Sequence, residues 1–357
     1  MKKLLAILLA AVMVVCVFAG CAQKTTETQA PAAETTTTET PAAEETPAAE
    51  EEAPAEETKE PYRVAFIVKS YSDTYTYLVS QMFDTYQKET YGDLYTVDFF
   101  DGELNNDTIN TLIETCVTQG YDGIIFQQND PDSPVPYVKA AVEAGVKVLV
   151  TVGSVNDDGE SVYIDANPVQ QGTLLTDYAT EQGVLKEGTN CVILRGIDST
   201  FHADGRHEGF VQGIEAVGAN IVDDQTANWS TSEALPIMEA WLISNPEIEV
   251  VFAANDDMAL GAIQAIQAAG RDDIKVYSVD ANELGCQALI DGQLAASVAQ
   301  DTVGYSHGAA DVMAKMLQGE TVESYRADSK LVTLDNVNDI LKEVHGYTDE
   351  EIAALYK

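Results

Sequence analysis

Basic side chains are scarce in this sequence. The 357-residue chain has 19 Lys and Arg residues against 59 Asp and Glu residues, which gives a formal net charge of −40 at pH 7. A protein of this charge repels phosphate backbones, so nucleic acid is not an expected partner. The chain also has no Gly-Lys pair and no G-x-G-x-x-G stretch, which excludes a P-loop and the dinucleotide-binding fingerprint. We therefore expect no cofactor.

Histidine and cysteine are also few. The chain has four His and five Cys residues, and none of them shows the C-x-x-C or Cys/His spacing that is typical of a metal site. We therefore expect no bound metal. Beyond Cys21, the remaining cysteines are Cys116, Cys191 and Cys286, which lie far apart in the sequence. An odd, widely spaced set does not predict a disulfide framework, so we expect these side chains to be buried as small apolar groups.

The amino end lacks an A-x-A cleavage site but has the other features of an export signal. It begins MKK, and Leu4–Phe18 is an unbroken apolar run that is short for a membrane span. The run ends in FAGC, which resembles the lipobox of bacterial lipoproteins, in which the Cys is lipidated and becomes the mature N-terminus. We expect residues 1–20 to be a lipoprotein signal peptide and Cys21 to be the lipidation site. A plain secretory signal with an incidental Cys is the alternative.

The next segment lacks aromatic residues altogether. Residues 22–60 consist mainly of Thr, Glu, Ala and Pro, a composition that cannot bury enough apolar surface to fold. We expect residues 21–60 to be a disordered acidic tether. A flexible chain of this length spans about 35 Å, and proline and charge repulsion extend it further. Such a tether suits a folded body that is anchored at the extracytoplasmic face of the cell membrane.

From Tyr62 onward, strand and helix patterns alternate. Runs such as YRVAFIV, GIIF and VVFAA are short and apolar on both faces, as in parallel strands that are covered by helices. Two successive arrays of this kind predict an α/β fold with two lobes, each a doubly wound parallel sheet. The tail after residue 330 adds a strand and a helix.

Polar and aromatic residues follow the carboxyl ends of these strands. Ligands of open α/β sheets bind beyond those ends. Carboxylates and amides there can pair with hydroxyl groups, and aromatic rings can pack on the C–H faces of a sugar. In Asn255-Asp256-Asp257 we expect Asn255 to face the cleft and one of the aspartates to cap the helix that follows. The positions that follow strands are 70–75, 127–128, 198–206, 228–229, 255–256, 280 and 300–301.

Three stretches carry a resemblance to a known family. They are LRGIDSTFHADGRHEGF, VVFAANDDMALGAIQAIQAAG and VYSVDANELGCQALIDGQLAASVAQD. In this order and spacing they resemble the type I periplasmic binding proteins of the ribose/galactose class, the solute-binding components of ABC sugar importers. The resemblance covers about residues 62–333.

The resemblance implies a role for individual residues. Tyr75 and Trp229 take the places of two aromatic residues that sandwich the sugar ring, and Asp73 takes that of a hydroxyl partner. Arg206 lies in the stretch that supplies an Arg to sugar oxygens. The other hydrogen-bonding positions that the resemblance implies are Gln127 or Gln128, Thr200, His202, Asn255, Asp280 and Gln300.

The resemblance also implies how the lobes are joined. Three crossovers near residues 164–167, 299–302 and 325–330 would form a hinge. The first lobe would comprise residues 61–165 plus 301–326, and the second lobe with the tail residues 166–300 plus 327–357. Ligand bound between the lobes of a monomer would favour the closed state through contacts that only that state makes.

The first-lobe loops depart from the family pattern. The first loop has Asp73-Thr74-Tyr75-Thr76 where members often have Asn-Pro-Phe-Phe or similar residues. After the fourth strand many members carry Asp-Arg or Asn-Lys, whereas this chain has VTVGS. Those charged partners are missing unless Ser154 or Asn156 substitutes for them. The identity of the sugar therefore stays open.

Several functions compete with solute capture. GYSHG at residues 304–308 matches the G-x-S-x-G motif of α/β hydrolases, but Ser306 is expected inside a helix and not at a strand end. A sugar-responsive repressor would need a basic helix-turn-helix where the acidic tether lies. We therefore expect no enzyme. Two hypotheses remain: capture of a sugar or polyol for the permease and ATPase of an ABC importer, or a ligand-sensing lipoprotein that docks on a membrane chemoreceptor or sensor kinase.

Overall fold

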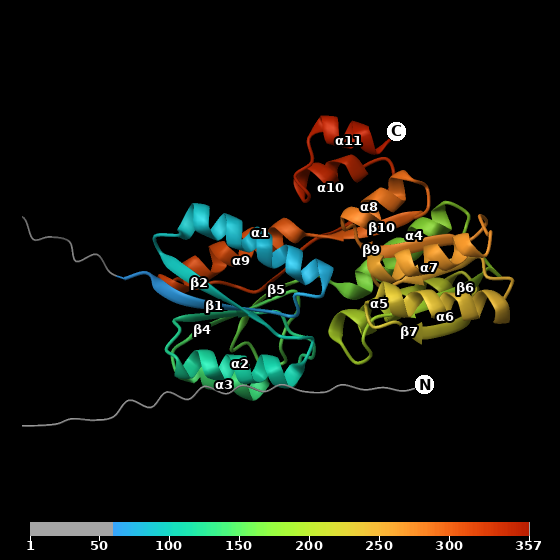
Figure 1. Ribbon diagram of the computed structural model, residues 1–357. Helices are drawn as coiled ribbons and strands as arrows, with labels where there is room; N and C mark the ends of the chain where they lie inside the picture. The colour runs from blue at the N-terminus through green and yellow to red at the C-terminus, as the bar shows by residue number, and fades with distance from the viewer. Residues whose placement is uncertain (1–59, 357) are drawn as a thin grey trace, which may run out of the picture. The chain divides into compact units, whose positions relative to one another are not determined.

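The computed structural model describes residues 60–356. These residues form two lobes, each built on one six-stranded sheet (Figure 1). The expected α/β fold with two doubly wound lobes is therefore confirmed. The expected signal peptide, Cys21 and residues 21–59 of the expected tether lie outside the described residues.

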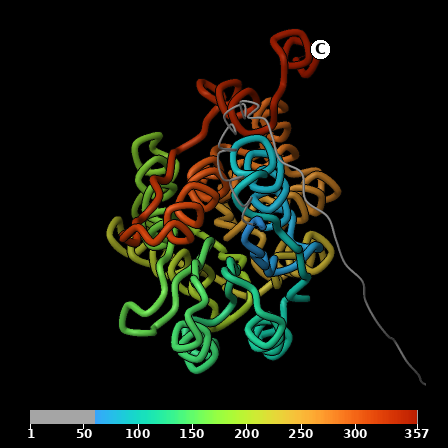
Figure 2. The backbone as a smooth tube through the Cα atoms, turned by 90° about the vertical axis from the view of Figure 1, so that its left-hand side faces the viewer, coloured from blue at the N-terminus to red at the C-terminus, as the bar shows by residue number. Residues whose placement is uncertain are grey.

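The first lobe has an all-parallel sheet of strand order β11-β5-β4-β3-β1-β2. Helices α1 and α9 pack together against one face, and α2 and α3 pack against the other, as Figures 1 and 2 both show. The strands are β1 Tyr62–Val68, β2 Tyr95–Asp101, β3 Gly123–Phe126, β4 Lys147–Thr151, β5 Val162–Asp165 and β11 Tyr325–Arg326. The helices are α1 Thr74–Tyr91, α2 Asn106–Thr118, α3 Val135–Glu143 and α9 Thr302–Leu317.

The alternation of β1 explains why this sheet has helices on both faces. Successive side chains of a strand point to opposite faces. Val64, Phe66 and Val68 pack in the core beneath α1 and α9. Ala65 and Ile67 pack in the core beneath α2 and α3. All five are fully buried. A strand that is covered by helices on both faces has apolar residues at every position and no alternation of apolar and polar residues.

The second lobe has strand order β12-β10-β9-β8-β6-β7, and β12 is antiparallel to β10. Its strands are β6 Asn190–Arg195, β7 Asn220–Thr226, β8 Val250–Ala253, β9 Lys275–Asp280, β10 Ala296–Gln300 and β12 Ser329–Val332. Its helices are α4 Pro168–Glu181, α5 Phe201–Ala216, α6 Thr231–Ser244, α7 Asp256–Ala268, α8 Glu283–Ile290, α10 Val337–Glu343 and α11 Asp349–Leu355. The tail helices α10 and α11 belong to this lobe, because Ile340, Leu341 and Ile352 pack in its core.

The chain passes between the two lobes three times. It does so between β5 and α4, between β10 and α9, and between β11 and β12. Asp301 occupies the second passage, and its side chain accepts a hydrogen bond from Gly304 N as the N-cap of α9. Short connections of this kind are where hinge motions are absorbed.

A fully buried carboxylate, Asp165, ties the hinge together. It accepts hydrogen bonds from Arg326 Nη1 at 2.8 Å, Ala166 N at 2.8 Å and His202 Nε2 at 3.0 Å. Tyr305 Oη donates to it at 3.3 Å. Burial lowers the pKa of His202, although Asp165 opposes this effect. These partners connect the first and third passages to α9 and to the second lobe.

The three cysteines among residues 60–356 are buried, as expected. Cys116, Cys191 and Cys286 are each at most 1% exposed. Burial raises the pKa of Cys116 to about 11 and that of Cys191 to about 12. Across residues 60–356, no helix is long and apolar enough to cross a membrane.

Candidate ligand-binding site between the lobes

Strand ends of both lobes and the hinge meet around one small polar pocket, which we call the ligand pocket. It encloses about 30 Å³, the volume of roughly one water molecule. A molecule of monosaccharide size therefore needs the lobes to move apart or side chains to rotate. The lining residues are Lys69, Asp73, Tyr75, Thr76 and Val152 of the first lobe, His202, Arg206, Trp229, Asn255 and Asp280 of the second lobe, and Gln300 at the hinge.

Two of the ten residues expected to bind ligand do not line this pocket. Gln127 is fully buried, donates from Nε2 to Thr76 O at 3.1 Å and accepts from Lys69 N at 2.9 Å. It thus holds the loop between β1 and α1. Thr200 precedes α5, and its Oγ1 donates to Ile197 O at 2.7 Å. Both side chains are engaged in local structure.

Arg206 is the central cation of the second-lobe side. It is 3% exposed, and it donates to Gln171 Oε1 at 2.8 Å and to Ala254 O at 2.6 Å. The helix that carries it, α5, lies very close to α4. A Cβ at Gly209 would come within 2.3 Å of Val169 O, so glycine is required for this approach.

Asp280 faces Arg206 across the pocket. Its Oδ1 lies 3.8 Å from Arg206 Nη1 and accepts from Gln300 Nε2 at 2.8 Å. Burial raises the pKa of Asp280 well above its usual range, and Arg206 only partly offsets this. Its φ of +121° is rare for a residue with a side chain, and such strain is concentrated at functional sites.

The Asn-Asp-Asp step after β8 differs in part from expectation. Asn255 lines the pocket and is also the N-cap of α7, because its side chain accepts from Met258 N at 2.9 Å. The prediction that one of the two aspartates caps this helix was wrong. Asp256 instead points into the lobe, where its carboxylate accepts hydrogen bonds from Ser278, Ser297 and Asn282 N. It is fully buried, and burial raises its pKa to about 6.

The two predicted aromatic residues both line the pocket, Tyr75 from α1 of the first lobe and Trp229 from the loop between β7 and α6 of the second lobe. Tyr75 is 6% exposed and contacts Tyr305 edge-on. Trp229 packs against Gly196, where a Cβ would lie 2.1 Å from the indole ring. Among the described residues, no hydrogen-bond partner lies at normal distance and angle from Tyr75 Oη or Trp229 Nε1, and both atoms are buried. Burial raises the pKa of Tyr75 well above its usual range, and the nearby Thr302 side chain partly offsets this. Buried polar atoms normally find a partner, so these two are available to a ligand.

Three lining residues were missed from the sequence. Lys69 is the first residue after β1 and is 6% exposed. Its Nζ lies 5.5 Å from the centroid of the Trp229 ring. Thr76 donates to Asp73 Oδ1 at 2.9 Å, and Val152 follows β4. The first loop was read from residue 70 onward, one residue past Lys69, and Val152 lies within VTVGS, where only charged or polar partners were sought.

One hydrogen bond bridges the lobes at the rim of the pocket. Thr74 Oγ1 at the start of α1 donates to Asp257 Oδ2 in α7 at 2.8 Å. Burial raises the pKa of Asp257, and the bond from Thr74 opposes this. The contact can exist only while these two helix ends are close together.

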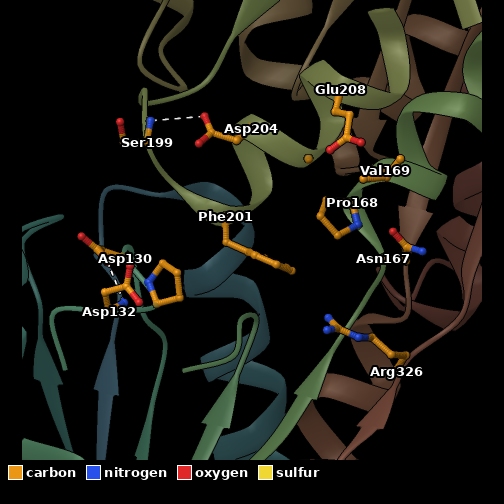
Figure 3. Close-up of a pocket in the computed structure, with 12 residues that line it drawn as sticks. Asp130, Asp132, Asn167, Pro168, Val169, Ser199, Phe201, Asp204, Glu208 and Arg326 are labelled. Carbon is orange, nitrogen blue, oxygen red and sulfur yellow. Dashed lines mark hydrogen bonds between the residues drawn. The ribbon is translucent and has the colours of Figure 1, made fainter. Parts of the chain in front are cut away.

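A larger groove of about 660 Å³ lies beside the hinge (Figure 3). Asp130, Asp132, Asp204 and Glu208 give it an acidic lining. Several of its polar groups already have partners within the chain: Asp204 accepts from Ser199 N, and Asp132 accepts from Asn156 Nδ2. Of the described residues that line it, none has a buried side-chain polar atom without a partner, whereas Tyr75 and Trp229 of the ligand pocket each have one.

Ser306 cannot act as a hydrolase nucleophile in this arrangement. It is fully buried within α9, and its Oγ donates to Thr302 O at 2.7 Å. A nucleophile elbow requires the Ser to be exposed at a sharp strand-to-helix turn. The G-x-S-x-G match is therefore part of an ordinary helix.

Comparisons with known proteins agree with this geometry. Residues 64–321 match the family model described as periplasmic binding protein domain. The chain is 32% identical over 252 residues to the ribose import binding protein RbsB of Salmonella typhimurium, covering 70% of this chain and 84% of that protein. It is 34% identical over 220 residues to a putative rhizopine-binding protein of Rhizobium meliloti, covering 59% and 71%.

Solved structures show the same architecture. A protein from Mycobacterium smegmatis in complex with β-D-fucofuranose superposes with a TM-score of 0.74 and 27% identity, covering 82% of this chain and 97% of that one. An ABC transporter solute-binding protein from Bacillus halodurans with bound myo-inositol gives 0.73 and 28%, covering 78% and 97%. The chain therefore belongs to the type I periplasmic binding protein family, whose members are solute-binding proteins and not enzymes.

Proposed function

We propose that this protein captures a neutral monosaccharide or sugar-like polyol in the ligand pocket and delivers it to the permease of an ABC importer. The observation that carries this proposal is the combination of unpaired buried donors on Tyr75 and Trp229 with the polar groups of Arg206, Asn255 and Asp280. The relatives support it, since they include proteins described as binding ribose, β-D-fucofuranose and myo-inositol.

Each group in the pocket has a role that suits a polyhydroxylated ring. Asp280 and Asn255 can accept hydrogen bonds from hydroxyl groups, and Arg206 can donate to two neighbouring oxygens. Trp229 and Tyr75 can pack on the apolar faces of the ring while their polar ends remain near its edges. Because the residues come from both lobes, a ligand that contacts all of them is bound only in the closed state.

We further propose that the protein acts outside the cytoplasm and is anchored through lipid on Cys21. The FAGC sequence and the acidic segment that follows it support this proposal. A Cys21→Ala variant should be released from the membrane fraction and should lose incorporation of labelled fatty acid. Continued membrane association with unchanged labelling would refute the assignment of Cys21.

A thermal-shift screen tests the capture function. The purified protein is heated with pentoses, hexoses, inositols and furanoses in turn, and with amino acids, dipeptides and organic acids as the contrasting set. A ligand at 100 times its dissociation constant adds about 2.7 kcal/mol to the free energy of unfolding. We expect at least one neutral sugar or cyclitol to raise the melting temperature. Stabilisation by the contrasting set alone would overturn the proposal.

A further inference from the structure

Among the described residues that line the ligand pocket, Val152 is the one aliphatic residue. It is 4% exposed and has a φ of +55°. A β-branched residue in the left-handed region is a genuine outlier, and such outliers are kept where the surrounding structure imposes them at functional sites. Its backbone N donates to Ile164 O at 3.1 Å, which fixes the end of β4. Val152 packs at the edge of the first-lobe core, where that core borders the pocket.

The polar residues that follow Val152 do not take its place in the pocket. Asn156 donates from Nδ2 to Asp132 Oδ1 at 2.7 Å, beside the hinge. The carbonyl of Ser154 accepts from Gln128 Nε2 at 3.0 Å, and neither Ser154 nor Asn156 lines the pocket. The first lobe therefore presents an apolar surface at the end of β4.

Lys69 supplies the charge on the same lobe. Lys69 lines the pocket, and its Nζ lies 5.5 Å from the centroid of the Trp229 ring. The nearby charges are Asp73 on the same loop, and Arg206 and Asp280 on the opposite lobe. Burial lowers the pKa of Lys69, and Asp73 opposes this effect. The Nζ group in the pocket lining can donate a hydrogen bond to an oxygen of the ligand.

We propose that the ligand pocket selects a deoxy sugar, with a methyl or methylene carbon against Val152 and a ring or hydroxyl oxygen within reach of Lys69. This inference rests on the proposed function and names the ligand class of that site. A hydroxyl group placed against Val152 would lose its hydration without gaining a partner. A methyl group there buries apolar surface against apolar surface.

Calorimetry with matched sugar pairs tests this inference. The pairs are D-galactose with D-fucose, L-mannose with L-rhamnose, and D-ribose with 5-deoxy-D-ribose, so that each pair differs by one hydroxyl group. For the pair that fits the pocket, the deoxy member should bind about 10- to 100-fold more tightly, the range over which apolar pockets discriminate such neighbours.

Three variants test whether the preference for the deoxy sugar comes from Val152. Val152→Asn places a hydrogen-bonding side chain at the same point, and Asn tolerates the left-handed backbone better than other residues. It should reduce the preference to less than threefold or reverse it. Val152→Ile keeps the apolar surface and should retain the preference. Lys69→Met should weaken both members of the pair by a similar factor and leave their ratio unchanged. Melting temperatures of the free variants confirm that each is folded.

The outcomes separate this inference from the proposed function. If sugars bind but the hydroxylated member is preferred, or the preference survives Val152→Asn in a folded protein, the deoxy-sugar inference is refuted while sugar capture stands. If no member of any pair binds, and other neutral sugars and cyclitols also fail, the proposed function itself is refuted.

Discussion

Replacing Trp229 with Ala should weaken ligand binding without unfolding the protein. Trp229 is only partly buried and is held by Gly196 beneath its ring and by two cations beside it. Lys69 Nζ lies 5.5 Å and the Arg206 guanidinium 5.7 Å from the ring centroid. These contacts come from two different lobes, and the ring packs only at the partly exposed edge of the second-lobe core. Truncation of this side chain should therefore affect the closed pocket more than the fold.

The expected magnitude follows from these contacts. Packing of an aromatic ring contributes about 0.5–1.5 kcal/mol beyond buried area, and a partly exposed cation–π contact contributes about 0.5–1 kcal/mol. Losing the ligand's ring contact together with the interlobe contact to Lys69 therefore costs about 2 kcal/mol of binding free energy. This loss of binding free energy corresponds to a dissociation constant that is roughly 30-fold higher.

The second tryptophan of the chain provides the control. Trp241 is 2% exposed and packs in the core of the second lobe. Trp241→Ala should lower the free energy of unfolding by about 3–5 kcal/mol. Because the chain has two Trp residues, Trp241→Phe leaves Trp229 as the only indole fluorophore. Sugar titration of that variant should change the tryptophan emission.

Two results would refute this reasoning. One is a Trp229→Ala protein that binds the sugar with unchanged affinity in calorimetry. The other is a Trp241→Phe protein whose emission does not respond to saturating ligand. Either would mean that the indole of Trp229 is not part of the ligand's surroundings.

Further predictions concern the Thr74–Asp257 hydrogen bond at the rim of the pocket, the buried carboxylate of Asp256 and the three buried cysteine thiols. Thr74→Val removes the hydrogen bond to Asp257 between the lobes. Calorimetry should show ligand binding that is about 3- to 10-fold weaker, while the melting temperature of the free protein stays unchanged. Unchanged affinity would show that the bond does not favour closure. The folded-state pKa of Asp256 is raised to about 6 from 3.8, so its ionisation makes the folded state less stable as the pH rises from about 4 to 6. Relative to Asp256→Asn, the wild type should lose on the order of 2 kcal/mol over this range in urea unfolding, and parallel pH profiles of the two proteins would contradict the assignment. The buried thiols should react with a thiol reagent only after unfolding, and rapid labelling of the native protein would contradict their burial; they are Cys116, Cys191 and Cys286.

The second lobe's part of the pocket was predictable because its strands are clearly delimited. The apolar run that ends before Asn255 and the run that ends at Asp280 locate two strand ends without ambiguity. Parallel strands bring those ends to one edge of a sheet. The same logic locates Gln300. Local pattern and global topology agree there, and prediction works best where they do.

Other residues could not be assigned from the sequence because their partners are distant in the chain. Gln127 follows a strand like the pocket residues, but its amide is used to hold the loop at Lys69 and Thr76. The role of Asp256 depends on Ser278 and Ser297 in two other strands. A helix-cap rule alone could not distinguish Asp256 from Asn255, since both residue types are good caps.

A bound sugar should lie in the ligand pocket between the two lobes. A crystal structure of the protein with the most stabilising sugar from the thermal-shift screen should place the ring between Trp229 and Tyr75, with hydroxyl groups on Arg206, Asn255 and Asp280. A sugar bound in the acidic groove beside the hinge, or outside the space between the lobes, would contradict the account.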